Sequence, residues 1–222
     1  MKLTHLHRNI GITTAALALS VTLAACSEES GGSSNASDSK DTPAETESTQ
    51  SGAGAETFGE GCSQIPTDGA GSFDGMVKDP VATAASNNPL LSTLVTAVTS
   101  VDGLADTLNG AEELTVFAPT NDAFAEIPEE DLNGLVMEAK EKGQDSMLYT
   151  VLAHHVVGAN ATADEIGGEQ ETLVGDSLTI EGDPESGMTV TDGTVTANVL
   201  CGNIPTANAT VYVIDKVMTG VK

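Results

Sequence analysis

Ten consecutive residues near the middle of the chain set its architecture: Thr115-Val116-Phe117-Ala118-Pro119-Thr120-Asn121-Asp122-Ala123-Phe124. The run that ends at Pro119 is β-branched and aromatic, which is typical of a strand. Asn121 is a residue type that caps helix N-termini, so a short helix is expected to follow. Phe117 and Phe124 each contribute about 1.5–3 kcal/mol when they are buried. We therefore expect Phe117, Pro119, Asn121 and Phe124 to build a junction between strand and helix, which is a structural role.

Helices are expected on both sides of this junction. Asp79-Pro80 and Asn88-Pro89 each place a capping residue before a proline, which is favoured at the first helical position. Apolar residues then recur every three or four positions through Val98, which predicts a helix with one buried face. Further helices are predicted near residues 102–108, 128–143 and 145–153, and a brief one is predicted to begin at Asn121.

The pattern changes beyond Gly168. Alternating or β-branched runs predict strands near 172–174, 177–180, 188–191, 194–199 and 210–217, separated by turn residues. Helices therefore come first and strands follow. This order indicates an α+β domain with an antiparallel or mixed sheet, and argues against repeated βαβ units.

Three segments carry a resemblance to a known family. Residues 115–124 resemble the first signature box of the fasciclin domain family, residues 152–157 (Leu152-Ala153-His154-His155-Val156-Val157) are similar to its second box, and residues 211–217 to its closing strand. Residues 79–89 and 201–212 look closest to the mycobacterial secreted and lipid-anchored fasciclin-domain antigens. The resemblance implies a fasciclin-type domain, in which N-terminal helices pack on a β-wedge of antiparallel and mixed strands.

The composition excludes one class of partner. The chain has 222 residues with 8 Lys+Arg against 33 Asp+Glu, which gives a formal net charge of −25. Nucleic-acid binding depends on Lys and Arg that displace counterions from phosphates, so no nucleic-acid partner is expected. Aromatic residues are only 3% of the chain, which argues against a sugar-stacking platform. The hydrophobic content suffices for one domain core.

Residues 1–25 are interpreted as a secretory signal, because Lys2 and Arg8 precede an apolar run. A transmembrane helix is the alternative, but spanning takes about 20 apolar residues and this run is shorter. The end of the run, Leu23-Ala24-Ala25-Cys26, resembles the lipobox of bacterial lipoproteins. The resemblance implies that Cys26 becomes a lipid-modified N-terminus. The mature chain would carry 6 − 33 = −27, so only the lipid would hold it to an acidic membrane.

Residues 26–61 are expected to form a disordered acidic linker after the lipidated cysteine, because they contain a single large apolar residue, Phe58. The domain is then expected to span residues 62–222.

Once Cys26 is assigned to the lipid, Cys62 and Cys201 remain as a pair, and we expect a disulfide between them in an oxidising compartment. Its loop of 139 residues corresponds to about 5 kcal/mol in the chain-entropy model. A zinc site is the alternative, although two cysteines without nearby histidines provide too few ligands. In the fasciclin branch named above, a disulfide joins cysteines at these two positions.

No catalytic, cofactor-binding or metal-binding residue is expected, because the chain lacks a serine nucleophile elbow, a zinc helix, a phosphate loop and a dinucleotide fingerprint. Only His154 and His155 remain after signal cleavage. We expect His155 to be buried and hydrogen-bonded and His154 to be partly exposed, and both are candidate binding residues beside the loop 158–166. In animal members of the family, a tyrosine before this histidine is linked to integrin adhesion, whereas this chain has His154.

The sequence thus predicts a cell-surface adhesion or interaction module without enzymatic activity. It would be monomeric, anchored by lipid to the cell membrane and exposed on the extracellular side, with a protein, matrix or envelope component as its partner. The alternative is a solute- or lipid-binding lipoprotein that serves a membrane transporter. Such a protein would need an apolar cavity of about 300 Å³ or more.

Overall fold

The computed structural model describes residues 52–221. The expected signal, Cys26 and the linker up to residue 51 lie outside the described residues. The helical elements are η1 (Glu60–Gln64), α1 (Phe73–Met76), α2 (Val81–Ser86), η2 (Pro89–Leu91), α3 (Ser92–Ser100), α4 (Leu104–Gly110), α5 (Asn121–Ala125), α6 (Glu129–Lys142), η3 (Gly143–Asp145) and α7 (Met147–His154). The strands are β1 (Leu114–Pro119), β2 (Val156–Val157), β3 (Gly168–Glu171), β4 (Ser177–Asp183), β5 (Gly187–Thr191), β6 (Thr196–Pro205) and β7 (Ala209–Ile214).

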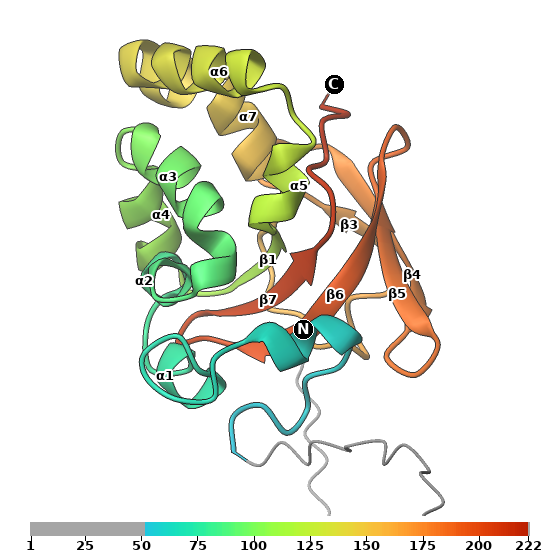
Figure 1. Cartoon of the computed structure of the whole chain (residues 1–222). Coiled ribbons are helices and arrows are strands. Elements are labelled where there is room, and N and C mark those ends of the chain that lie inside the picture. The colour runs from blue at the N-terminus through green and yellow to red at the C-terminus, as the bar shows by residue number, and fades with distance from the viewer. Residues whose placement is uncertain (1–51, 222) are drawn as a thin grey trace, which may run out of the picture. The chain divides into compact units, whose positions relative to one another are not determined.

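The strands form one mixed sheet in the order β2-β1-β7-β6-β5-β4-β3. β1 and β7 run parallel, and the other neighbouring strands are antiparallel. An isolated bridge between Val157 and Thr172 links the β2 end of the sheet to the segment after β3. Helices α2 to α7 gather on one side of β1 and β7, and strands β3 to β6 curl away on the other (Figure 1). The α+β class and the expected order of helices before strands are confirmed.

The alternation of side chains along β1 and β7 separates two cores. Val116 and Ala118 belong to a cluster that the helices cover, which we call the helical core. Phe117 belongs to a second cluster inside the curled sheet, which we call the strand core. Tyr212 lies beside Phe117 there, with 5.6 Å between the ring centroids. β1 and β7 are buried along their full lengths, because successive side chains of a strand point to opposite faces and both faces are covered.

Strand β6 passes from one core to the other. Val199 lies in the strand core, whereas Cys201 and Ile204 lie in the helical core. The change of face is possible because the pairing of β6 with β7 shifts register twice between Val199 and Ile204. Asn203, within this irregular stretch, has a φ of 58°.

In α6, the longest of the described helices, the charged residues are arranged so that they stabilise both ends of the helix. Three acidic residues occupy its first turn, and Lys140 and Lys142 occupy its last. Each set opposes the partial charge at its helix end. The helix ends at Gly143, whose φ of 58° is readily adopted by glycine.

Several helix caps come from distant parts of the chain. Asn121 was expected to cap α5, and this is wrong: Thr120 accepts the capping hydrogen bond from the Ala123 N–H. Asn121 instead caps α3, because its Oδ1 accepts from the Thr93 N–H at 2.9 Å. The first N–H groups of α2 donate to Asn208 and Asn109, and the Pro80 cap position has no side-chain hydrogen bond.

The ordered domain begins before Cys62. Phe58, expected in the linker, pairs with Gly202 of β6 through two backbone hydrogen bonds. The Phe58 ring covers Gly202 so closely that a Cβ atom at this position would overlap it. The structure also joins Cys62 to Cys201 by a disulfide. Both contacts fix the segment around η1 onto β6, so residues 58–61 belong to the domain.

Candidate functional site

Both histidines of the second signature box are buried. His154 is the last residue of α7 and is 1% exposed, and His155 follows it at 3% exposed. The expectation that His154 is partly exposed is therefore wrong. His154 still belongs to the last helical turn, so the two rings do not point to opposite faces of a strand. They meet edge to face, with 6.3 Å between their centroids.

The two ring nitrogens of His155 are both engaged with the backbone. Nε2 accepts a hydrogen bond from the Met218 N–H at 2.9 Å, and Nδ1 lies 2.7 Å from the Val151 carbonyl oxygen. A carbonyl can only accept, so Nδ1 carries the proton and the ring is neutral. Burial lowers the pKa of His155 from 6.5 to about 4, and the Val151 carbonyl partly opposes this change.

His154 lies between two carboxylates. Its Nδ1 is 3.5 Å from Asp176 Oδ2, and its Nε2 is 3.8 Å from Asp192 Oδ2. The Asp192 side chain is fully buried. Burial by itself would raise the pKa of Asp192, but hydrogen bonds from three backbone N–H groups outweigh burial and hold it below the ordinary value.

This buried cluster holds the C-terminal segment in place. Asp192 Oδ1 accepts from the N–H groups of Thr194 and Val195, which closes the turn between β5 and β6. Its Oδ2 accepts from the Gly220 N–H at 2.7 Å. Together with the bond from Met218 to His155, this fixes the residues after β7. The cluster thus holds the C-terminal segment against the rest of the domain, and neither histidine forms an exposed binding face.

The exposed part of the neighbourhood is the loop after β2. Gly158, Ala159 and Asn160 are exposed, whereas Ala161 and Ile166 anchor the loop in the strand core. Leu173, after β3, is 45% exposed, one of three large apolar side chains with such exposure among residues 52–221. Its Cδ2 lies close to Gly158. The surface around the expected loop therefore combines accessible backbone with an apolar side chain.

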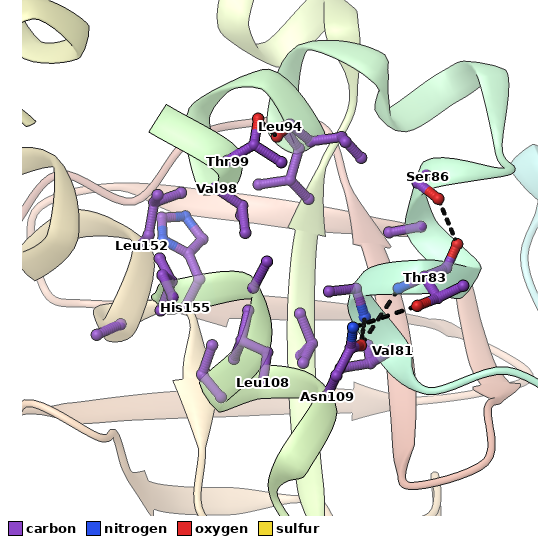
Figure 2. A pocket seen from close by; sticks show the side chains of 18 of the residues that line it. Val81, Thr83, Ser86, Leu94, Val98, Thr99, Leu108, Asn109, Leu152 and His155 are labelled. Atoms are coloured by element: carbon purple, nitrogen blue, oxygen red, sulfur yellow. Dashed lines mark hydrogen bonds between the residues drawn. The ribbon is translucent and has the colours of Figure 1, made fainter. Parts of the chain in front are cut away.

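An apolar cavity of about 220 Å³ lies on the helical side of the site. Side chains from α2, α3 and α4 converge on it, and His155 and Leu152 line it from the opposite direction (Figure 2). Val116 of β1 and Leu173 also line it. The face of His155 thus borders the cavity while its nitrogens bond to the backbone.

The polar groups at the edge of the cavity bond to the protein itself. Asn109 Oδ1 accepts from the N–H groups of Ala82 and Thr83, and its Nδ2 donates to Thr83 Oγ1. Ser86 Oγ donates to the Thr83 carbonyl and Thr99 Oγ1 to the Val95 carbonyl. These bonds are drawn in part in Figure 2. The interior of the cavity is consequently lined by hydrocarbon.

Among residues 52–221, no group of three or more His, Cys, Asp or Glu side chains is placed to hold a metal ion. Within the same part of the chain, no helix has the length and apolar character needed to cross a membrane.

The sequence did not identify Asp176, Asp192 or the cavity. Asp192-Gly193 was interpreted only as a turn, which located Asp192 in the chain without placing it against His154.

Comparison with known proteins gives consistent matches. The model of the fasciclin domain matches residues 89–220. The chain is 44% identical over 172 residues to the cell surface glycolipoprotein MPB83 of Mycobacterium bovis, a match that covers 74% of this chain and 72% of that protein. It is 40% identical over 174 residues to the immunogenic protein MPT70 of Mycobacterium tuberculosis, covering 75% and 83%.

Among solved structures, a domain pair from the insect cell adhesion molecule fasciclin I matches with a TM-score of 0.45 at 20% identity. The match covers 59% of this chain and 44% of that one.

Proposed function

This chain belongs to the fasciclin domain family, and we propose that it is a lipid-anchored protein of the outer cell surface that acts as an interaction or adhesion module. The observation that carries the proposal is its 44% identity to a protein named as a cell surface glycolipoprotein. The N-terminal sequence supports the same location, because the signal-like residues 1–25 end at a lipobox-like Cys26. The lipid on Cys26 is then the contact with the membrane, since the charge of the chain opposes adsorption to acidic headgroups.

The role proposed is binding without catalysis. A general base needs a free nitrogen or carboxylate oxygen within reach of substrate. Both nitrogens of His155 are used by backbone groups, and the carboxylate of Asp192 accepts three backbone hydrogen bonds inside the protein. This arrangement favours a structural role for His155 and Asp192.

The partner is a protein or a matrix or envelope component, and the chain binds it as a monomer. The contact surface we propose consists of the exposed residues of the loop 158–165 together with Leu173. An exposed apolar side chain beside accessible backbone is a suitable centre for a small interface, because burying it removes apolar area from water.

The location is tested on intact cells that express the full chain, with an amine reagent that does not cross membranes. The expected result is a labelled chain in the membrane fraction, and release of the Cys26→Ser chain from that fraction. An unsubstituted chain that stays unlabelled in intact cells but reacts after lysis contradicts the surface location.

The interaction is tested by binding of the full Cys26→Ser chain to immobilised envelope and extracellular-matrix preparations. Leu173→Asp is expected to weaken binding at least tenfold. Met137→Asp is the matched control, because Met137 is also exposed, at 68%, but lies on α6. Equal binding by both variants, or no binding by the unsubstituted chain, contradicts the proposed surface.

The alternative function, delivery of a whole solute or lipid to a transporter, finds limited support in the dimensions of the cavity. Its volume of about 220 Å³ is below the roughly 300 Å³ at which small-molecule pockets begin. The cavity is large enough for part of a ligand only.

A further inference from the structure

We propose that the cavity between α2, α3 and α4 binds an uncharged alkyl chain of about nine carbons, the tail of a neutral amphiphile. The cavity shares Leu173 with the proposed interaction surface, but the proposal rests on the interior of the cavity and does not depend on that surface.

The lining determines the chemical class. The side chains that face the space are mainly aliphatic, such as Leu94, Val98, Leu108 and Leu152. Aliphatic walls gain dispersion contacts with any hydrocarbon that fills the space, and a cavity with such walls stays dry when it is empty. A hydrocarbon ligand would therefore displace no ordered water, and it would recover contacts that the lining lacks.

The charge distribution excludes an ionised ligand. None of the described residues that line the cavity is Asp, Glu, Lys or Arg, and His155 is neutral there. A fatty acid carboxylate would have no cation to pair with, in a chain that carries a net charge of −25. Burial of an unpaired charge is strongly unfavourable. The head group of the ligand is therefore uncharged.

The polar side chains lie at the edge of the cavity, so the alkyl chain of a ligand can fill the interior. Thr83, Ser86 and Thr99 are exposed residues of the lining, so the cavity opens between α2 and α3. Their hydroxyl groups, like the Asn109 amide, already bond within the protein. Each hydroxyl oxygen keeps acceptor capacity toward solvent, which suits a neutral donor such as an alcohol group at the opening.

The volume of the cavity sets the length of the alkyl chain that can be buried. A cavity of about 150 Å³ accommodates benzene, with six carbons, so by proportion a cavity of about 220 Å³ holds about nine carbons. A longer chain would extend out of the opening into solvent, where further carbons add little to binding.

The test is calorimetric titration of the full Cys26→Ser chain, which cannot carry a lipid on that residue, with primary alcohols from hexanol to dodecanol. Affinity is expected to rise about fourfold for each added carbon, as burial of methylene groups requires, and to level off near nine carbons. Decanoate is expected to bind at least tenfold more weakly than decanol. An affinity that rises without levelling off, or equal affinity for decanoate and decanol, overturns the proposal.

Location of the ligand is tested by filling the cavity. Ala105 of α4 is half-buried and lines the space, so Ala105→Phe is expected to lower decanol affinity at least tenfold. Ala125→Phe, at an exposed helical position on α5 outside the cavity, is the control and is expected to bind decanol normally. A folded Ala105→Phe chain that binds decanol as well as the control overturns the proposal.

A second measurement locates the ligand without any substitution, in case the Ala105→Phe chain does not fold. In the unsubstituted chain, decanol is expected to shift the methyl NMR signals of Val98 and Leu108 more than those of Leu178, which lies in the strand core. Shifts confined to surface methyl groups outside the cavity, such as that of Met137 on α6, or no shifts at saturating decanol, contradict the proposed site.

Discussion

The two cores on either side of β1 and β7 are filled in different ways. The strand core contains the Phe117 and Tyr212 rings, both fully buried, and side chains from a continuous curled sheet. The Tyr212 hydroxyl donates to the Ala161 carbonyl, and burial raises the pKa of Tyr212. The helical core instead joins several short helices rich in Ala and Val and retains a cavity of about 220 Å³.

The difference shows how element length controls packing. Neighbouring strands are held at a fixed spacing by their hydrogen bonds, so side chains on one face interdigitate over the whole sheet. Short helices have no such mutual spacing, and their separation depends on caps and side-chain size. Space is therefore left where α2, α3 and α4 meet β1, and this space is where a ligand can bind.

The largest expected effect comes from the disulfide, which fixes η1 to β6 where that strand passes between the cores. Replacing Cys62 and Cys201 by serine removes a constraint on a 139-residue loop. The free energy of unfolding is expected to fall by up to about 5 kcal/mol. Urea denaturation of the double variant measures it. A loss below about 1 kcal/mol would mean that the contacts of Phe58 hold the segment without the bond.

The next comparison uses the same substitution in both cores. Leu178→Ala in the strand core is expected to cost about 4 kcal/mol, because its fully buried side chain has close neighbours on all sides. Leu108→Ala, beside the cavity, is expected to cost about 2 kcal/mol because fewer contacts are lost. Urea denaturation of both variants provides the comparison, and equal losses would contradict the difference in packing.

The third prediction concerns pH and His155, which connects the cores: its ring borders the cavity, and its Nε2 holds Met218 of the strand core. The folded pKa of about 4 lies below the ordinary value of 6.5. Between these values the unfolded chain binds a proton that the folded chain excludes. The stability from His155 is therefore complete above about pH 6.5 and is lost as the pH falls toward 4, by about 3 kcal/mol.

The measurement is the free energy of unfolding at several pH values for the unsubstituted chain and for His155→Gln. Carboxylates titrate in both chains, so the difference between the two slopes isolates the histidine. Parallel slopes between pH 6.5 and pH 4 would show that His155 does not exclude the proton.

The smallest expected effect comes from a cap in the helical core. Asn121→Ala removes the acceptor for the Thr93 N–H and the bond from Asn121 Nδ2 to the Pro89 carbonyl. The expected loss of stability is about 1–2 kcal/mol, measured by thermal unfolding. Asn133→Ala, at an exposed position on α6, is the control. A similar loss in both variants would indicate a general helix effect instead of a cap.

Local signals located most of the elements but not their partners. The helix over α6 followed from Pro128, the apolar spacing after it and its end by Gly143, and β7 followed from a β-branched run. The strand predicted at 172–174 is wrong, because β3 covers Gly168–Glu171. That strand is the polar edge of the sheet, so it lacks the alternation that marks a half-buried strand. Leu173, the apolar signal there, lies in the exposed segment after it.

By itself the sequence determined the α+β order, the family and the pair of cysteines available to bond. These features depend on residue type and on spacing within a few positions, which a single chain displays directly. The tertiary structure decided which asparagine caps which helix, the burial of His154 beside Asp192, and the cavity. Each of these depends on residues that are distant in the chain, such as Asn208 and Val81, whose hydrogen bond spans 127 positions. Local propensity carries no information about such partners, because they meet only when the sheet brings them together.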